Sequence, residues 1–365
     1  MAGLLALVLV IVLDAVVVSA WFPWSALVSR VRPEQSVYWG VTRDRAELAR
    51  VAAREDAIRV GILGSSRGHT GFLREWAEEA MEGVAFAQLS HALQDPATVH
   101  ALVPDLIDAG IDVAVLTMSH VDTHRPVRLE PLPAKSTARL STLMPLVEVG
   151  GFAWLFEHRE AAYRIATAQL SNLYRFRDNL GRAGANGLRE FALDARLEGK
   201  RRVQLLGTPV LGEAGPARLA AKRERALLSR VLPHQQRWPL QLAWFKEVRD
   251  GPQVTAQMAW LERSIDDLVA AGVRVVIAEC PVHGIGKRVS QPGTEEAFRA
   301  FAAEQARRKG VFGLPLDDAV PYTMADYLDL FHLNERGAAR FTREIVGLLE
   351  REVLPAFETQ SRRVR

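Results

Sequence analysis

Residues 57–68 read Ala57-Ile58-Arg59-Val60-Gly61-Ile62-Leu63-Gly64-Ser65-Ser66-Arg67-Gly68, and they say more about the architecture of this chain than any other stretch. Their first half is a short β-branched apolar run, which is typical of a buried strand. Their second half sets two serines between glycines. This favours a tight turn, because glycine adopts backbone angles that other residues avoid. Apolar residues at helical spacing follow over 72–80, so a strand is predicted to turn directly into a helix.

The same alternation of strand and helix continues along the chain. Further strands are predicted over 84–89, 111–117, 273–279 and 311–314. Further helices are predicted over 96–109, 253–271, 294–309 and 335–352. Such alternation implies one parallel five-stranded sheet with helices on both faces. Ligands of these sheets bind at the carboxyl ends of the strands, so residues just after each strand are the candidates for chemistry.

Composition excludes several classes of protein. The 365 residues are 48% hydrophobic and 24% charged, a balance that excludes a disordered chain, a coiled coil and a collagen-like repeat. The single cysteine, Cys280, excludes an internal disulfide and a multi-cysteine metal site. The 46 basic and 43 acidic residues are interspersed, so no nucleic-acid partner is expected.

The N-terminal segment is apolar from Ala2 to Phe22 and carries one charge, Asp14. About 20 such residues suffice to cross a bilayer as a helix. The roughly 2.5–3.5 kcal/mol cost of an aspartate is offset by about 0.3–0.6 kcal/mol from each surrounding Leu, Ile or Val. We therefore expect a transmembrane anchor over 1–24 and a connector over 25–56. A cleaved signal peptide, cut after Val18-Ser19-Ala20, and a buried core helix are the alternatives.

The orientation of this predicted anchor is open. Arg30, Arg32, Arg43 and Arg45 follow the apolar segment, and the positive-inside rule would keep them in the cytoplasm. A low cysteine content is compatible with an exported domain instead. Both orientations therefore stand as hypotheses.

A second candidate for chemistry is Asp329-Leu330-Phe331-His332-Leu333-Asn334, which comes just before the last predicted helix. An aspartate can orient a histidine three residues later, and that histidine can take a proton from a serine. Ser66, in the turn after the first strand, would be that serine. The alternative for Ser66 and for Asn334 is a purely structural role as helix caps.

Together, the Gly-Ser-Ser turn and the Asp-x-x-His segment resemble the SGNH/GDSL hydrolase superfamily over residues 57–352. The chain is most similar to the membrane-anchored subgroup of alginate-acetylation and teichoic-acid D-alanylation accessory proteins. That subgroup has an N-terminal anchor, Gly-Ser-Ser, and a helical insert that 171–178 resembles. The resemblance implies a three-layer, flavodoxin-like α/β domain over 57–355, with a helical insert at about 125–250. The sequence itself indicates a basic tail over 356–365.

The resemblance also implies a function and site residues. Ser66 would be the nucleophile, His332 the base and Asp329 its orienter. The expected activity is that of a serine esterase or O-acyltransferase that needs no cofactor or metal and acts on acyl esters of a cell-envelope polysaccharide. The domain would be extracytoplasmic, and the expected partners are an acyl-ester or carbohydrate substrate, the bilayer and a multi-span membrane acyltransferase.

The chain departs from the family at the oxyanion hole. The family's Gly donor falls near Ser90–Ala92, its Asn donor falls within 117–120, and neither residue type is present there. Losing one donor typically lowers the rate about 10²–10³-fold. A catalytically degenerate binding or scaffold protein is therefore the alternative function. The candidates for oxyanion or pocket residues are Ser65, Arg67, His69, Ser90, Ser119 and His120.

Two further clusters are open to more than one interpretation. His120, Asp122 and His124 could bind a metal through alternating side chains, one of the two histidines could line the rim of the active site, or the cluster could lie in a solvated loop. Cys280 and His283 could form a nucleophile pair, although a buried structural cysteine is the simpler interpretation.

Overall fold

The computed structural model describes residues 2–17, 37–91, 94–124, 156, 159–171, 174, 241–246, 248 and 252–355. The chain forms two compact units, one of residues 1–43 and 128–230 and the other of residues 44–127 and 231–365. The predicted basic tail, the first part of the predicted connector (25–36) and most of the predicted insert lie outside the described residues.

A five-stranded parallel sheet forms the centre of the second unit, as predicted. Its strands are β1 (Ile58–Gly64), β2 (Val84–Gln88), β3 (Val113–Met118), β4 (Arg274–Glu279) and β5 (Val311–Leu314). Their order is β2-β1-β3-β4-β5, that of a flavodoxin-like sheet, and every neighbouring pair is parallel. The carboxyl ends therefore meet at one edge, where Gly64 pairs with Thr117 and Met118 with Glu279.

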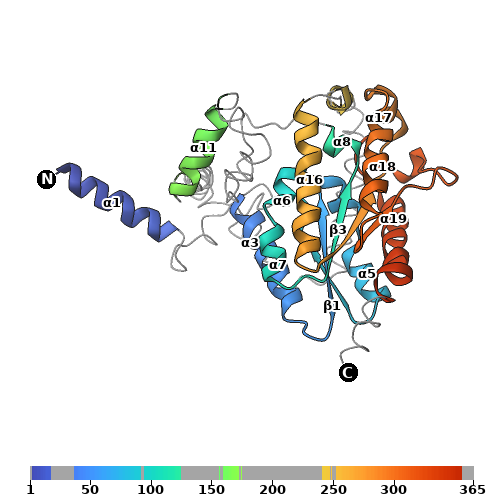
Figure 1. The fold of residues 1–365 in the computed structure, drawn as a ribbon, viewed down its shortest axis with the longest axis horizontal. Helices are drawn as coiled ribbons and strands as arrows, with labels where there is room; N and C mark the ends of the chain where they lie inside the picture. Colours follow the sequence, from blue (N-terminus) through green and yellow to red (C-terminus); the bar gives the residue numbers. More distant parts are fainter. Residues whose placement is uncertain are drawn as a thin grey trace, which may run out of the picture. The chain divides into compact units, whose positions relative to one another are not determined.

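Helices cover both faces of this sheet because the strands carry apolar residues on both sides (Figure 1). One face packs against α3 (Val37–Ala52), α6 (Pro96–His100), α7 (Val103–Asp108), α16 (Pro252–Ala270) and α18 (Thr294–Gln305). The other packs against α5 (Arg74–Ala80), α19 (Glu335–Leu348) and the π-helical turn η3 (Leu349–Val353). Short elements at the strand ends are α4 (Ser66–Gly71), α8 (His120–Thr123), α17 (Gly284–Val289) and η2 (Met324–Asp326).

Two details of the predicted layout differ in the structure. The helix predicted over 96–109 is divided into α6 and α7, because Pro104 lacks the N–H that would continue the first helix. Residues Leu48 and Val51 of α3 are buried in the sheet core. The second unit therefore begins at Asp44, inside the segment predicted to be a connector.

The N-terminal residues form α1 (Ala2–Val17), which is apolar and 16 residues long. Among the described residues, no helix is both long and apolar enough to cross a membrane. The rest of the predicted span lies outside those residues. Within the same unit, Ser171 follows α11 (Arg159–Leu170), and its hydroxyl donates to Asp14 Oδ1 at 2.7 Å.

Candidate active site

The turn after β1 exposes Ser66 at the start of a helix. Ser65 is the N-cap of α4, and its hydroxyl accepts a hydrogen bond from the N–H of Arg67 at 3.4 Å. Ser66 is the first residue of α4 and is partly exposed. The capping role considered for Ser66 therefore falls to Ser65, which leaves the Ser66 hydroxyl available for chemistry.

Two glycines bring this turn against β3. Gly64 has a φ of +145°, and a Cβ there would lie 2.3 Å from the carbonyl oxygen of Thr117. A Cβ on Gly68 would lie 1.9 Å from Thr117 Oγ1. The Thr117 hydroxyl donates to the carbonyl of Leu63 at 2.6 Å, so it cannot turn away without losing that bond. Thr117, which the sequence did not single out, thus holds the serine turn in place.

The predicted Asp-x-x-His segment places its two side chains beside Ser66. Asp329 is buried, and its Oδ1 accepts the backbone N–H groups of Phe331 at 2.7 Å and His332 at 2.9 Å. Asp329 Oδ2 lies 2.9 Å from His332 Nδ1. His332 Nε2 lies 2.9 Å from Ser66 Oγ, although the two residues are 266 positions apart in the sequence. The structure therefore brings the three predicted residues into one hydrogen-bonded line.

The electrostatics of Asp329 suit an orienting role. Burial opposes its ionisation, but the hydrogen bonds from His332 and from two backbone N–H groups outweigh burial and lower the pKa of Asp329 to about 2. Asp329 is therefore a carboxylate at neutral pH and accepts the Nδ1 proton of His332. Nε2 of His332 then presents its lone pair to the Ser66 hydroxyl.

Acid is expected to remove the stability that Asp329 contributes. Its folded pKa of about 2 lies below the ordinary 3.8, so the contribution is present above about pH 4 and is lost as the pH falls toward 2. The loss should be about 2 kcal/mol. Urea unfolding between pH 2 and pH 5 measures it, and Asp329→Asn should have a correspondingly flatter profile. Equal slopes in the two proteins would contradict the assignment.

The serines predicted as oxyanion donors are engaged within the fold. Ser90 is fully buried, and its hydroxyl donates to the carbonyl of Ile62 at 3.1 Å. Ser119 caps α8: its hydroxyl accepts from the N–H of Val121 at 3.1 Å, and its N–H donates to Asp122 Oδ2 at 2.9 Å. The N–H of Ser66 remains as a donor, because the first residues of a helix have no acceptor within it.

The side chain of Arg67 stabilises the serine turn from within the fold. Its guanidinium is buried and forms an ion pair with Asp122, the carboxylate that also accepts from Ser119. This pair ties α4 to the segment after β3. The sequence suggested a metal ligand or a solvated loop residue at Asp122, and its pairing with Arg67 was not predicted because a partner 55 residues away leaves no local signal.

His120 is a buried neutral imidazole. It is 1% exposed, and neither ring nitrogen has a hydrogen-bond partner in the described part of the chain. Burial, followed by the charge of Arg67, lowers its pKa to about 3. His124 Nδ1 lies 3.0 Å from Thr123 Oγ1. His69 is half-buried on α4, and its carbonyl accepts from Gln88 Nε2 at 3.3 Å.

The two alternative sites are not assembled. No group of three or more His, Cys, Asp or Glu side chains among the described residues is placed to hold a metal ion. Burial raises the pKa of the Cys280 thiol to about 12, so it stays protonated. His283 Nδ1 accepts from the N–H of Ile285 at 3.1 Å, and its ring packs edge-on to Tyr327.

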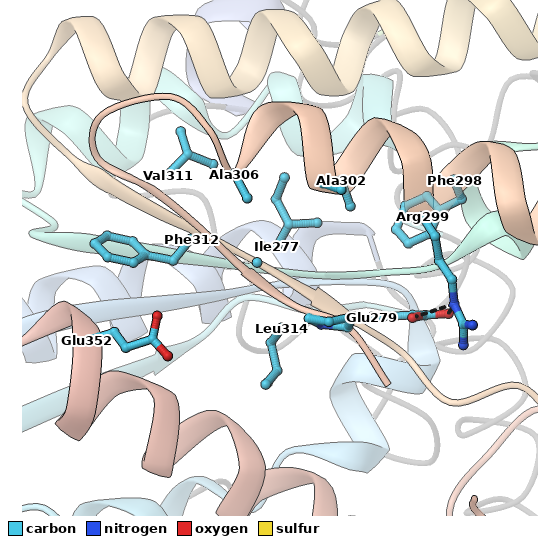
Figure 2. A pocket seen from close by; sticks show the side chains of 13 residues that line it. Ile277, Glu279, Phe298, Arg299, Ala302, Ala306, Val311, Phe312, Leu314 and Glu352 are labelled. Atoms are coloured by element: carbon cyan, nitrogen blue, oxygen red, sulfur yellow. Dashed lines mark hydrogen bonds and ion pairs between the residues drawn. The ribbon is translucent and has the colours of Figure 1, made fainter. Parts of the chain in front are cut away.

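A separate cavity of about 390 Å³ lies between α18 and β5 (Figure 2). Figure 2 shows Arg299 paired with Glu279 at one end and Glu352 at the other. Its remaining lining is apolar and comes mainly from α18, β4 and β5. None of Ser66, Asp329 and His332 lines it, so we do not include it in the candidate site.

Comparisons with protein-family models, with curated proteins and with solved structures found no match. The assignment of a function therefore depends on the geometry of the site and on the sequence motifs.

Proposed function

We propose that this chain is a membrane-anchored serine esterase or O-acyltransferase of SGNH type that acts on acyl esters of a cell-envelope polysaccharide. The observation that carries the proposal is the line of hydrogen bonds from Asp329 through His332 to Ser66, with 2.9 Å at each step. Its support from the sequence is the Gly-Ser-Ser turn followed, before the last helix, by Asp-x-x-His.

The proposed reaction has two steps, acylation of Ser66 and transfer of the acyl group from Ser66 to an acceptor. Ser66 Oγ attacks the ester carbonyl while its proton passes to His332 Nε2, and the carbonyl electrons move onto oxygen. The Ser66 N–H stabilises that oxyanion. The tetrahedral intermediate then collapses: His332 returns the proton to the leaving alkoxide, and an acyl-serine remains. Water or a sugar hydroxyl then gives its proton to His332 Nε2 and attacks the acyl carbonyl; the bond to Ser66 Oγ breaks, and Ser66 takes the proton back from His332. Asp329 stabilises the imidazolium formed in each step.

The proposed location also comes from the sequence. The apolar segment over 2–22 supports a single-pass anchor, and the resemblance to envelope acylation proteins supports a domain outside the cytoplasm beside a multi-span acyltransferase. A periplasmic reporter such as alkaline phosphatase, fused to the C-terminus, should be active. Activity of a cytoplasmic reporter alone would contradict this orientation.

Covalent labelling tests the proposed activity. A fluorophosphonate probe should label the full-length wild-type protein, because His332 activates the Ser66 hydroxyl, and should not label Ser66→Ala. Ser65→Gly is the matched control: glycine is nearly as good an N-cap as serine, so labelling should persist. Equal labelling of wild type and Ser66→Ala would overturn the proposal.

A second candidate function is a binding or scaffold protein with a degenerate site. It is favoured by the engagement of Ser90 and Ser119 within the fold, at the positions of the family's two further oxyanion donors. Such a protein would bind an acetylated oligosaccharide in calorimetry, equally well in wild type and Ser66→Ala, and would not react with the probe.

A further inference from the structure

The loop that carries Asp329 and His332 is closed at its base by backbone hydrogen bonds and by the amide side chain of Asn334. The N–H of Asn334 donates to the carbonyl of Asp326 at 3.0 Å. The next residues inward, Tyr327 and Leu333, form an antiparallel bridge. Further in, the N–H of Leu328 donates to the carbonyl of His332 at 2.8 Å. The loop is therefore a small hairpin whose tip is residues 329–331.

The side chain of Asn334 makes contacts in two directions. Its Oδ1 accepts the N–H of Gly337 at 3.1 Å and so caps α19. Its Nδ2 donates to the carbonyl of Ala325 at 2.7 Å and, more weakly, to that of Tyr327 at 3.4 Å. Capping uses only the oxygen. The two donations tie the outgoing end of the hairpin to its incoming end.

The closeness of the hairpin and α19 is fixed by a glycine. A Cβ on Gly337 would lie 2.2 Å from the carbonyl oxygen of Asp326. Asp326 also accepts from the N–H of Thr323 and pairs with Arg336 at 3.0 Å, which fastens the hairpin base to both flanking elements. Asn334 sits at the junction of these contacts, two residues after His332.

We propose that Asn334 is a positioning residue. Its amide N–H groups hold the hairpin in the conformation that places His332 Nε2 beside Ser66 Oγ and keeps Asp329 hydrogen-bonded to His332 Nδ1. This inference rests on the proposed function. Proton transfer requires a heavy-atom distance of about 2.6–3.2 Å. If the hairpin could shift by one ångström, proton transfer from Ser66 to His332 (the proton relay) would be lost although α19 stays intact.

Asn334→Asp separates positioning from capping. The carboxylate retains the oxygen that caps α19 and is favoured at a helix N-terminus. Its second oxygen repels the carbonyls of Ala325 and Tyr327 instead of donating to them. We expect a melting temperature close to that of wild type, a kcat for an acetyl ester lowered about 10–100-fold, and a nearly unchanged KM.

Proton NMR of His332 reports directly on its hydrogen bond with Asp329. In full-length protein with labelled histidines, the Nδ1 proton of His332, assigned by its loss in His332→Gln, should resonate downfield because of Asp329. It should move or broaden in Asn334→Asp. This signal needs no turnover, so it tests the inference even if wild type hydrolyses no ester, whereas absent probe labelling of wild type tells against the proposed function alone.

Asp95→Ala is the matched control. Asp95 caps α6 by accepting from the N–H of Thr98 at 2.9 Å, so its loss weakens a helix without touching the hairpin. Its kcat and the His332 resonance should stay unchanged. A folded Asn334→Asp with wild-type kcat and resonance would overturn the inference. So would a loss of kcat that only follows the folded fraction. If Asn334→Asp does not fold, Asn334→Ser, which retains a capping oxygen, serves in its place.

Discussion

Replacing His332 by alanine is expected to lower kcat for an acetyl ester by on the order of 10⁴–10⁶-fold. The reason is the 2.9 Å contact between His332 Nε2 and Ser66 Oγ, without which the serine keeps its proton and is a weak nucleophile. Residues that act as one unit are not additive, so His332→Ala combined with Ser66→Ala should be no slower than either single variant. Steady-state kinetics on the purified full-length proteins measure this.

Asp95→Ala provides the control for this experiment, because Asp95 caps α6 and takes no part in the hydrogen-bonded line of Asp329, His332 and Ser66. Its kcat should stay within a few-fold of wild type. Additive losses in the double variant would show that Ser66 and His332 act independently, and would contradict a proton relay.

Replacing Gly64 by alanine is expected to destabilise the second unit by at least about 4 kcal/mol. Gly64 has a φ of +145°, which an L-residue rarely adopts, and its new Cβ would meet the backbone oxygen of Thr117 at 2.3 Å. A backbone atom cannot rotate away as a side chain can. Relief therefore requires β1 to separate from β3, with loss of ladder hydrogen bonds. Urea unfolding followed by tryptophan fluorescence measures the change.

Gly83→Ala is the matched control for Gly64→Ala. Gly83 also has a positive φ, +77°, but an added Cβ would meet nothing within 4 Å. Only the conformational cost of about 1–2 kcal/mol should appear there. If the two variants lose equal stability, the contact with Thr117 does not limit this position.

The sheet, the serine turn and the Asp329–His332 pair were predictable from the sequence because each has a local signal, whereas the pairing of Ser66 with His332 was expected from the family resemblance. A strand such as 58–64 shows itself by consecutive apolar β-branched residues, and Asp329 and His332 lie within one short motif. A capping role was considered for Ser66, whereas the structure gives it to Ser65, the neighbouring small hydroxyl residue. Only the backbone of the turn, with Ser65 extended and Ser66 helical, separates them.

Other features could not be predicted because they depend on partners far along the chain. The ion pair of Arg67 with Asp122 and the fit of Gly68 against Thr117 both join α4 to β3 or to the segment that follows it. The burial of Leu48 and Val51 was missed for a related reason: the apolar face of α3 becomes a core element only once the sheet is present to receive it.

The unit that carries the site is built from two separated parts of the chain, 44–127 and 231–365. The first part supplies β1 to β3 and Ser66, the second supplies β4, β5 and His332, and the two join along the ladder between β3 and β4. A cut placed between residues 128 and 230 would leave the proposed nucleophile, Ser66, and the proposed base, His332, on different fragments. If the chain is the proposed esterase, each fragment alone would be inert, and the two together would gain activity only by completing the sheet. A complementation assay that follows ester turnover would then report the association of the two polypeptides.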